Sequence, residues 1–287
     1  MIDDRRKLLQ KFVAYRIEDL NVAEHLNVNG RLSYCTILSM DISEICAKAQ
    51  GFSKHLQEVK SSASEIPWYP YQTLGSFGTL DSILSGPYRR LLELSNRGPI
   101  ADIGAADGDL AFFLESLGHE VHVIDYPPTN YNALKGLRKL REMLGSKITI
   151  SEINLETQFH LPIKHYSLVF FLGTLYHLQN PFYVLRSLAD AADYCLLSTR
   201  VAQVTADQQI RFSDIPVAYL VAPYETNNDP TNYWIFSKAG LHRILDRTGW
   251  DICCYGTMGD KVNSDPSSAN RDERAFCLLR SRSRKIG

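Results

Sequence analysis

The sequence predicts an α/β fold with a doubly wound, mostly parallel sheet of seven strands, a C-terminal antiparallel hairpin and an N-terminal helical extension. From Pro99 onward, short apolar runs alternate with helical patterns, which is typical of βαβ units. The last two apolar runs are joined by a polar loop without a helix signal, so they should pair as antiparallel strands. Residues 3–60 carry apolar positions spaced by three and four, which indicates helices.

The first third of the chain is predicted to be helical with one irregular segment. Residues 65–78 combine proline and glycine with four aromatic side chains, a composition that favours an ordered loop. A helix is expected over residues 79–94. We therefore expect two regions, a helical extension or lid over residues 1–78 and a nucleotide-binding type of domain over residues 79–287.

The alternating region is assigned in chain order. Strands are expected at residues 99–104, 120–126, 147–153, 166–173, 194–201, 250–256 and 275–281. Helices are expected at residues 109–118, 130–145, 181–192 and 237–249, with a long irregular stretch over residues 203–235. Glycines at positions 118 and 145 follow the first two of these helices, as expected of C-terminal caps.

Composition excludes several classes of function. The net charge of −1 provides no global basic field of the kind that drives non-specific nucleic-acid binding. The first residues are charged where a signal peptide needs an apolar run, and no stretch reaches about 18 apolar residues, so a cytoplasmic protein outside the membrane is expected. The six cysteines lack CxxC spacing and no His/Asp cluster has metal-ligand spacing, so we expect reduced cysteines and no metal.

The most informative segment is the strand-to-helix turn that follows the first predicted strand. Small residues at Gly104, Ala106 and Gly108 allow the backbone to bend tightly and approach a ligand, and Asp102 precedes them. Asp125 ends the next predicted strand, where a carboxylate accepts hydrogen bonds from ribose hydroxyls. The two signals together predict a nucleotide site.

The spacing of the turn disfavours a dinucleotide. The G-x-G-x-x-G fingerprint requires glycine where this chain has Ala106 and Asp109. An oxidoreductase that uses NAD is therefore the weaker alternative, to be tested by which cofactor raises the melting temperature.

Residues 99–280 resemble the class I S-adenosylmethionine (SAM)-dependent methyltransferases, in which an acidic residue precedes a glycine-rich turn and the sheet ends in a hairpin. Ala106 departs from the glycine that is frequent in that family. The resemblance implies that SAM is the cofactor and that Gly108 faces it, so that a bulky side chain there would abolish binding in a folded domain. The cofactor-binding residues that it implies are Asp102, Gly104, Ala106, Gly108, Asp125, Tyr126, Asn154, Leu155, Leu172 and Gly173.

A narrower resemblance involves residues 172–182 and 229–250. Both segments are similar to the bacterial tRNA wobble-uridine carboxymethyltransferases and their uncharacterised relatives. The kinship is at family level, and the identity of the substrate does not follow from it.

Candidate catalytic residues follow the fourth predicted strand. Tyr176 and His177 lie where the mouth of the active site should open, and His177 is a candidate base because an imidazole titrates near neutral pH. A hydrogen-bonding residue beside a helix is the alternative role for His177. Asn180 and Pro181 resemble part of a nitrogen-methyltransferase motif, but a capping asparagine followed by a first-turn proline explains them without chemistry.

Aromatic residues in two loops are candidates for the acceptor pocket. Trp68 and Tyr71 precede the predicted domain, while Tyr233 and Trp234 end the irregular stretch, and we expect both pairs to line the acceptor side of one pocket. The sequence thus predicts methyl transfer, without a metal, to a small molecule or an RNA nucleoside. A SAM-binding protein without turnover is the other alternative, and the oligomeric state is left open.

Overall fold

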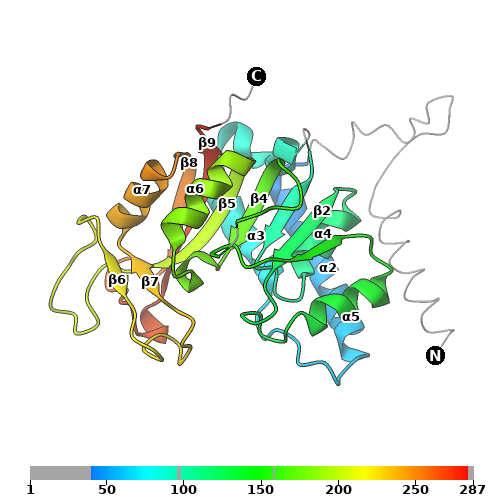
Figure 1. Cartoon of the computed structure of the whole chain (residues 1–287), viewed down its shortest axis with the longest axis horizontal. Coiled ribbons are helices and arrows are strands. Elements are labelled where there is room, and N and C mark those ends of the chain that lie inside the picture. The colour runs from blue at the N-terminus through cyan, green and yellow to red at the C-terminus, as the bar shows by residue number, and fades with distance from the viewer. Residues whose placement is uncertain (1–39, 96–97, 158, 284–287) are drawn as a thin grey trace. The chain divides into compact units, whose positions relative to one another are not determined.

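A computed structural model describes residues 40–95, 98–157 and 159–283 of the chain (Figure 1). These residues fall into two compact units, one ending at Glu152 and the other beginning at Ile153. The helices predicted within residues 3–39 lie outside the described residues. The division predicted at residue 78 stays a prediction.

The first unit begins with a long helix whose apolar face packs on its neighbours. Helix α2 (Ile42–Ser61) starts at a capping box in which Asp41 and Glu44 satisfy each other's backbone N–H groups. It packs against α3, α4 and α5, and its Phe52 ring lies 5.6 Å from that of Phe113. Figure 1 shows α2, in blue, beside α5. The helix predicted up to residue 60 is thus confirmed over its described part.

The helix predicted over residues 79–94 is wrong in extent. Helix α3 (Ser76–Ile83) is followed by two 3-10 turns, η3 (Gly86–Arg89) and η4 (Leu91–Ser95), and preceded by η2 (Thr73–Gly75). Gly86 has a φ of +54° and Pro87 follows it, so a continuous α-helix is interrupted there.

The sheet of the first unit is parallel throughout. Its elements in order are β1 (Ile100–Ile103), α4 (Asp109–Ser116), β2 (Val121–Asp125), α5 (Lys135–Leu144) and β3 (Thr149–Glu152). Strand β2 pairs with both β1 and β3 in parallel register. Helix α5 starts at Lys135 rather than at residue 130, because Asn130 accepts the N–H groups of Asn132 and Leu134 in a series of turns.

The second unit contains the predicted C-terminal hairpin. Its main elements are β4 (Tyr166–Leu172), η5 (Leu175–His177), α6 (Pro181–Ala191), β5 (Ala192–Val201), α7 (Lys238–Arg247), β8 (Trp250–Gly259), η6 (Ala269–Arg271) and β9 (Glu273–Ser281). Strands β4 and β5 are parallel, whereas β9 runs antiparallel to both β5 and β8. The mostly parallel sheet with an antiparallel end is therefore confirmed.

Two short strands lie in the stretch that the sequence left irregular. Strand β6 (Ala218–Leu220) is antiparallel to β7 (Trp234–Phe236). Strand β7 pairs in parallel with β5, with Phe236 opposite Val201. Three-residue strands are too short to establish a visible alternation of apolar and polar residues. Figure 1 shows this pair at the end of the unit that also carries α7.

The core of the second unit surrounds β4 and β5. Helix α6 packs on β5, and the buried indole of Trp250 donates to the Leu185 carbonyl at 3.0 Å. The five cysteines of the described ranges are free thiols. In the part of the chain that the structure describes, no helix combines the length and apolarity needed to cross a membrane.

Candidate functional site

The turn over residues 104–108 connects β1 to α4 through three left-handed residues. Gly104, Ala106 and Gly108 have φ angles of +71°, +55° and +83°. Glycine adopts such angles without steric cost, whereas an alanine costs about 1–2 kcal/mol. The turn is therefore strained at Ala106, the position where the chain departs from the glycine frequent in the family that it resembles.

Asp125 ends β2, next to the turn, and its carboxylate is held from several sides. The backbone N–H of Tyr126 donates to it at 2.7 Å, and the side chain of Asn130 donates at 3.0 Å. The N–H groups of Ala105 and Ala106 also face it. Burial raises the pKa of Asp125 against the effect of these donors. Tyr126 itself is half-buried at the start of the next loop.

Asp102 is a buried acid on β1. It is 4% exposed, and its Oδ2 has no hydrogen-bond partner among the described residues. Burial raises its pKa to about 8, and the Asp125 carboxyl adds to that shift. The Asp102 carboxyl also has a backbone hydrogen bond from Ala111, which favours its ionised form. A buried carboxyl with one free oxygen beside a second carboxyl favours a positive charge nearby. SAM carries two, an ammonium and a sulfonium, so these residues fit that cofactor.

Gly108 has a different steric role from the one predicted. A Cβ there would lie 2.3 Å from Cδ1 of Leu137 and 3.0 Å from Cε2 of Phe112, both in the core beneath the turn. The expectation that a larger side chain would enter the ligand side of the turn in a folded domain is corrected. A side chain at Gly108 would therefore meet the buried Leu137 and Phe112, so it opposes folding first.

Asp107 was not predicted as a functional residue, yet it joins the 104–108 turn to the helical segment. It is 2% exposed, and its carboxylate accepts the Tyr69 N–H at 2.7 Å and the Asn132 side chain at 2.8 Å. Lys60 of α2 lies 3.2 Å from the same group and 2.8 Å from that of Asp109. No local pattern marks these contacts, because the partners are far apart in sequence.

The two aromatic residues predicted in the first loop have different surroundings. The Trp68 indole donates to the carbonyls of Lys60 and Ala63, so it anchors the loop to α2. Tyr71 is 68% exposed and contacts Tyr69 edge to face, with ring centroids 5.4 Å apart. Of this pair, Tyr71 is the one available to a ligand.

In the second unit, Gly173 follows β4 directly in a left-handed conformation with a φ of +68°. Its N–H donates to the carbonyl and to the hydroxyl of Ser198, both at 3.0 Å. A Cβ at this position would lie 3.5 Å from the Tyr176 hydroxyl. The neighbouring Leu172 is half-buried. The 3.5 Å distance to the Tyr176 hydroxyl is ordinary van der Waals contact, so the left-handed backbone rather than lack of space favours glycine here.

Tyr176 and His177 lie together in η5, directly after β4. Their rings are 4.4 Å apart, and Nη1 of Arg274 donates to the Tyr176 hydroxyl at 3.4 Å. Burial lowers the pKa of His177, with Asp229 raising it and Arg274 lowering it. A histidine with a lowered pKa is neutral at pH 7 and can accept a proton.

Tyr233 and Trp234 lie beside this pair, and their place in an acceptor pocket stays a prediction. The Tyr233 N–H donates to the Tyr176 carbonyl at 2.8 Å, and its hydroxyl accepts from Gln179 at 3.0 Å. The Trp234 indole donates to the Gln179 carbonyl at 3.2 Å. Asn180 caps α6 by accepting the Tyr183 N–H ahead of Pro181, which confirms its structural role.

Asn154 and Leu155 follow β3 in a short turn of the second unit. The Asn154 side chain accepts the Glu156 N–H at 3.0 Å, and Leu155 is buried. The Glu156 carboxylate in turn accepts the Asn180 N–H at 2.7 Å. Their contacts are those of turn and packing residues, and their role toward adenine stays a prediction.

Arginines in the second unit were also missed by the sequence reasoning. Arg200 and Arg274 stand directly opposite each other on β5 and β9, and Asp272 is within 4 Å of both, at 3.0 and 3.9 Å. Like charges opposite each other on paired strands are destabilising unless a counter-charge is shared. The pairing arises from the β5–β9 register, which local patterns do not set.

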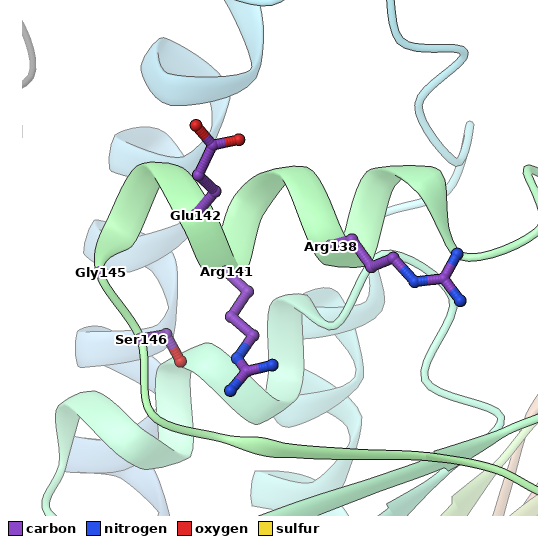
Figure 2. A pocket seen from close by; sticks show the side chains of 5 residues that line it. All are labelled: Arg138, Arg141, Glu142, Gly145 and Ser146. Atoms are coloured by element: carbon purple, nitrogen blue, oxygen red, sulfur yellow. The ribbon is translucent and has the colours of Figure 1, made fainter.

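A separate open pocket lies at the C-terminal end of α5 (Figure 2). It is lined by Arg138, Arg141, Glu142, Gly145 and Ser146. Figure 2 shows Arg141 and Ser146 on the same side of the helix end and Glu142 on the other. Within the described ranges, no group of three or more His, Cys, Asp or Glu side chains is arranged to hold a metal ion.

Comparisons with known proteins show the fold. No protein-family model and no curated protein matches the chain. The crystal structure of the N-terminal domain of EvdMO1 with S-adenosylhomocysteine (SAH) bound is similar, with a TM-score of 0.52 and 16% identity over 85% of this chain and 98% of that chain. The same domain in the presence of SAH and D-fucose gives a TM-score of 0.52 and 15% identity over the same shares. At these identities the likeness shows a common fold.

Proposed function

We propose that the protein is a SAM-dependent methyltransferase that transfers a methyl group to a small-molecule or nucleoside acceptor by in-line displacement without a metal. The observation that carries the proposal is the left-handed turn at residues 104–108, placed between the carboxyl groups of Asp102 and Asp125. Asp102 lies near the carboxyl end of β1 and Asp125 ends the adjacent parallel strand β2, and such strand ends are where these folds bind nucleotides. The SAH in the similar EvdMO1 domain supports the same cofactor.

Each part of the cofactor has a candidate partner in the first unit. Asp125 would accept the ribose hydroxyls, and Tyr126 would flank the adenine. Asp102 would attract the positive charge of the amino-acid end, because its buried carboxyl has an oxygen without a partner among the described residues. The 104–108 turn would supply close backbone approach.

In the second unit, Tyr176 and His177 would act on the acceptor. Methyl transfer from a sulfonium needs alignment of the nucleophile, exclusion of water and, for a hydroxyl or amine, removal of a proton. Tyr233 and Trp234 of the same unit would then contact the acceptor. Tyr176→Phe or His177→Ala should lower turnover with little change in cofactor affinity.

The first test is cofactor binding. Calorimetry with SAM, SAH and NAD should give saturable binding of SAM and SAH, and no binding of NAD. Saturable NAD binding without SAM binding would overturn the proposal in favour of an oxidoreductase.

The second test is transfer of a labelled methyl group. The protein is incubated with SAM labelled in the methyl group and with separate pools of total small RNA and of small-molecule extract. Label in the RNA pool supports a nucleoside acceptor, and label in the extract supports a small-molecule acceptor. Label in neither pool, despite SAM binding, indicates a binding protein without turnover.

A further inference from the structure

Three residues of the second unit form a continuous chain of hydrogen bonds that ends at His177. The Nδ1 atom of His177 lies 2.9 Å from the hydroxyl oxygen of Thr231 and 3.2 Å from its carbonyl oxygen. The Thr231 hydroxyl donates to Oδ1 of Asp229 at 2.6 Å. The order is therefore imidazole, hydroxyl, carboxylate.

This chain determines which imidazole nitrogen carries the proton. A carbonyl oxygen only accepts hydrogen bonds, and the Thr231 hydroxyl has already given its hydrogen to Asp229. Both neighbours of Nδ1 are thus acceptors, so Nδ1 must be the donor. In the neutral ring the lone pair then lies on Nε2.

The orientation is fixed by the backbone as well as by side chains. Asp229 also accepts the N–H of Thr231 at 2.8 Å, which closes a tight turn around Pro230. Two residues later, the Tyr233 N–H donates to the carbonyl of Tyr176, the residue that precedes His177. The loop and η5 are therefore joined at two points, Thr231 with His177 and Tyr233 with Tyr176.

The charged groups that face His177 are Asp229 and Arg274, and the Tyr176 ring packs on it. Burial lowers the pKa of the imidazole, so the ring is neutral at pH 7. A proton taken up at Nε2 would place a positive charge on the ring, which the Asp229 carboxylate stabilises through Thr231. In this arrangement a carboxylate holds a base in one tautomer, as in other pairs of a base and an orienting group.

We propose that Thr231 and Asp229 are positioning residues that orient His177 as a general base, and that the acceptor atom carries a proton, as in a hydroxyl or an amine. The inference rests on the proposed function. As the bond from the methyl carbon to the acceptor atom forms, the bond from that carbon to sulfur breaks, and sulfur keeps the electron pair. The acceptor's proton passes to Nε2 of His177, which later releases it to solvent.

The test uses the full chain labelled with ¹⁵N-histidine and saturated with SAH. In the wild type, NMR should show His177 with a protonated Nδ1 and an unprotonated Nε2. Thr231→Ser keeps the hydroxyl and should preserve this state. Thr231→Val removes the hydroxyl and leaves only the carbonyl oxygen, 3.2 Å from Nδ1, so the share of rings protonated at Nδ1 should fall. Asp229→Asn should lower the pKa of His177 measured by NMR titration, because a negative charge is lost.

Chemical reactivity provides a second readout that a merely structural role would not change. Diethylpyrocarbonate reacts with an unprotonated imidazole nitrogen, so mass spectrometry should find His177 modified in the wild type and in Thr231→Ser. Modification should be slower in Thr231→Val, in proportion to the loss of rings with a free Nε2. Thr205→Val is the matched control, since Thr205 also donates to an aspartate, Asp207, without a histidine.

Two results would overturn the inference. One is a His177 whose Nε2 carries the proton, because the lone pair would then be committed to Thr231. The other is a Thr231→Val variant with the same tautomer and the same reactivity as Thr231→Ser. If the valine variant does not fold, Asp229→Asn takes its place in this comparison. Calorimetry on the same samples separates these from failure of the proposed function, which would appear as a wild type that binds no SAH.

Discussion

Lys60 of α2 forms an ion pair with Asp107 in the 104–108 turn, with Nζ 3.2 Å from Oδ2. The lysine side chain is 14% exposed and that of Asp107 is 2% exposed, so the pair is largely removed from water. Breaking such a pair by removing one partner leaves an uncompensated buried charge. The helical segment is thus linked electrostatically to the turn that we propose binds the cofactor.

Lys60→Met should weaken SAH binding by about tenfold or more, which corresponds to about 1.4 kcal/mol. The reason is that Asp107 would retain only its Tyr69 and Asn132 donors and the turn would reorganise. Calorimetry at constant folded fraction measures the effect. Arg89→Met is the control, because Arg89 forms half-exposed ion pairs with Asp41 and Asp81 in the same unit, away from Asp107. Equal affinities in the two variants would contradict the link.

Asp125→Ala should weaken SAM and SAH binding at least about tenfold, because a carboxylate that accepts hydroxyl groups contributes about 1.5–3 kcal/mol per charged bond. Asp81→Ala removes an exposed carboxylate of the same unit and should leave affinity unchanged. Titration calorimetry of both folded variants decides the matter. An Asp125→Ala protein with wild-type affinity would rule out the ribose assignment.

Asp102 should make stability depend on pH. Its folded pKa is raised from 3.8 to about 8, so the folded state binds the proton more tightly than the unfolded state. The resulting stability is fully present below pH 3.8 and is lost as pH rises through about 8. Asp102→Asn mimics the protonated acid and removes this dependence. Denaturant unfolding should show the wild type losing at least about 2 kcal/mol relative to the variant between pH 5 and pH 9.

The same group should couple pH to cofactor binding. A cationic ligand favours the ionised form of Asp102, so SAM binding would release its proton. SAM affinity should therefore rise as pH increases from 6 to 9 in the wild type, and this rise should be smaller in Asp102→Asn. If SAM affinity had the same pH profile in the wild type and in Asp102→Asn, the result would contradict an interaction of Asp102 with the cofactor.

Gly108→Ala should destabilise the first unit before it affects binding. The left-handed conformation costs about 1–2 kcal/mol for alanine, and crowding against the buried Leu137 adds roughly 1–3 kcal/mol. Gly78→Ala is the control, since nothing lies within 4 Å of its added Cβ in α3. Thermal unfolding without ligand should show a lower midpoint for Gly108→Ala alone. Equal midpoints would contradict the packing role.

Much of the candidate site could be predicted from local sequence. The strand-to-helix turn at residues 104–108 and the carboxylate of Asp125 are each recognisable within a few residues, because small side chains and strand ends have local signatures. The extents of two helices were wrong for local reasons as well. Asn130 and Asn132 fold their own turns ahead of α5, and Gly86 with Pro87 interrupts the helix after α3.

The sequence by itself determined the alternation of strands and helices, the antiparallel C-terminal hairpin and the position of the turn, because these depend on which residues within one element are buried. Only the tertiary structure decided the pairing of Lys60 with Asp107, 47 residues apart, and of His177 with Thr231, 54 residues apart. It also decided that Gly108 faces Leu137. Such contacts arise where separate elements pack, and no periodicity along the chain encodes which side chains then meet.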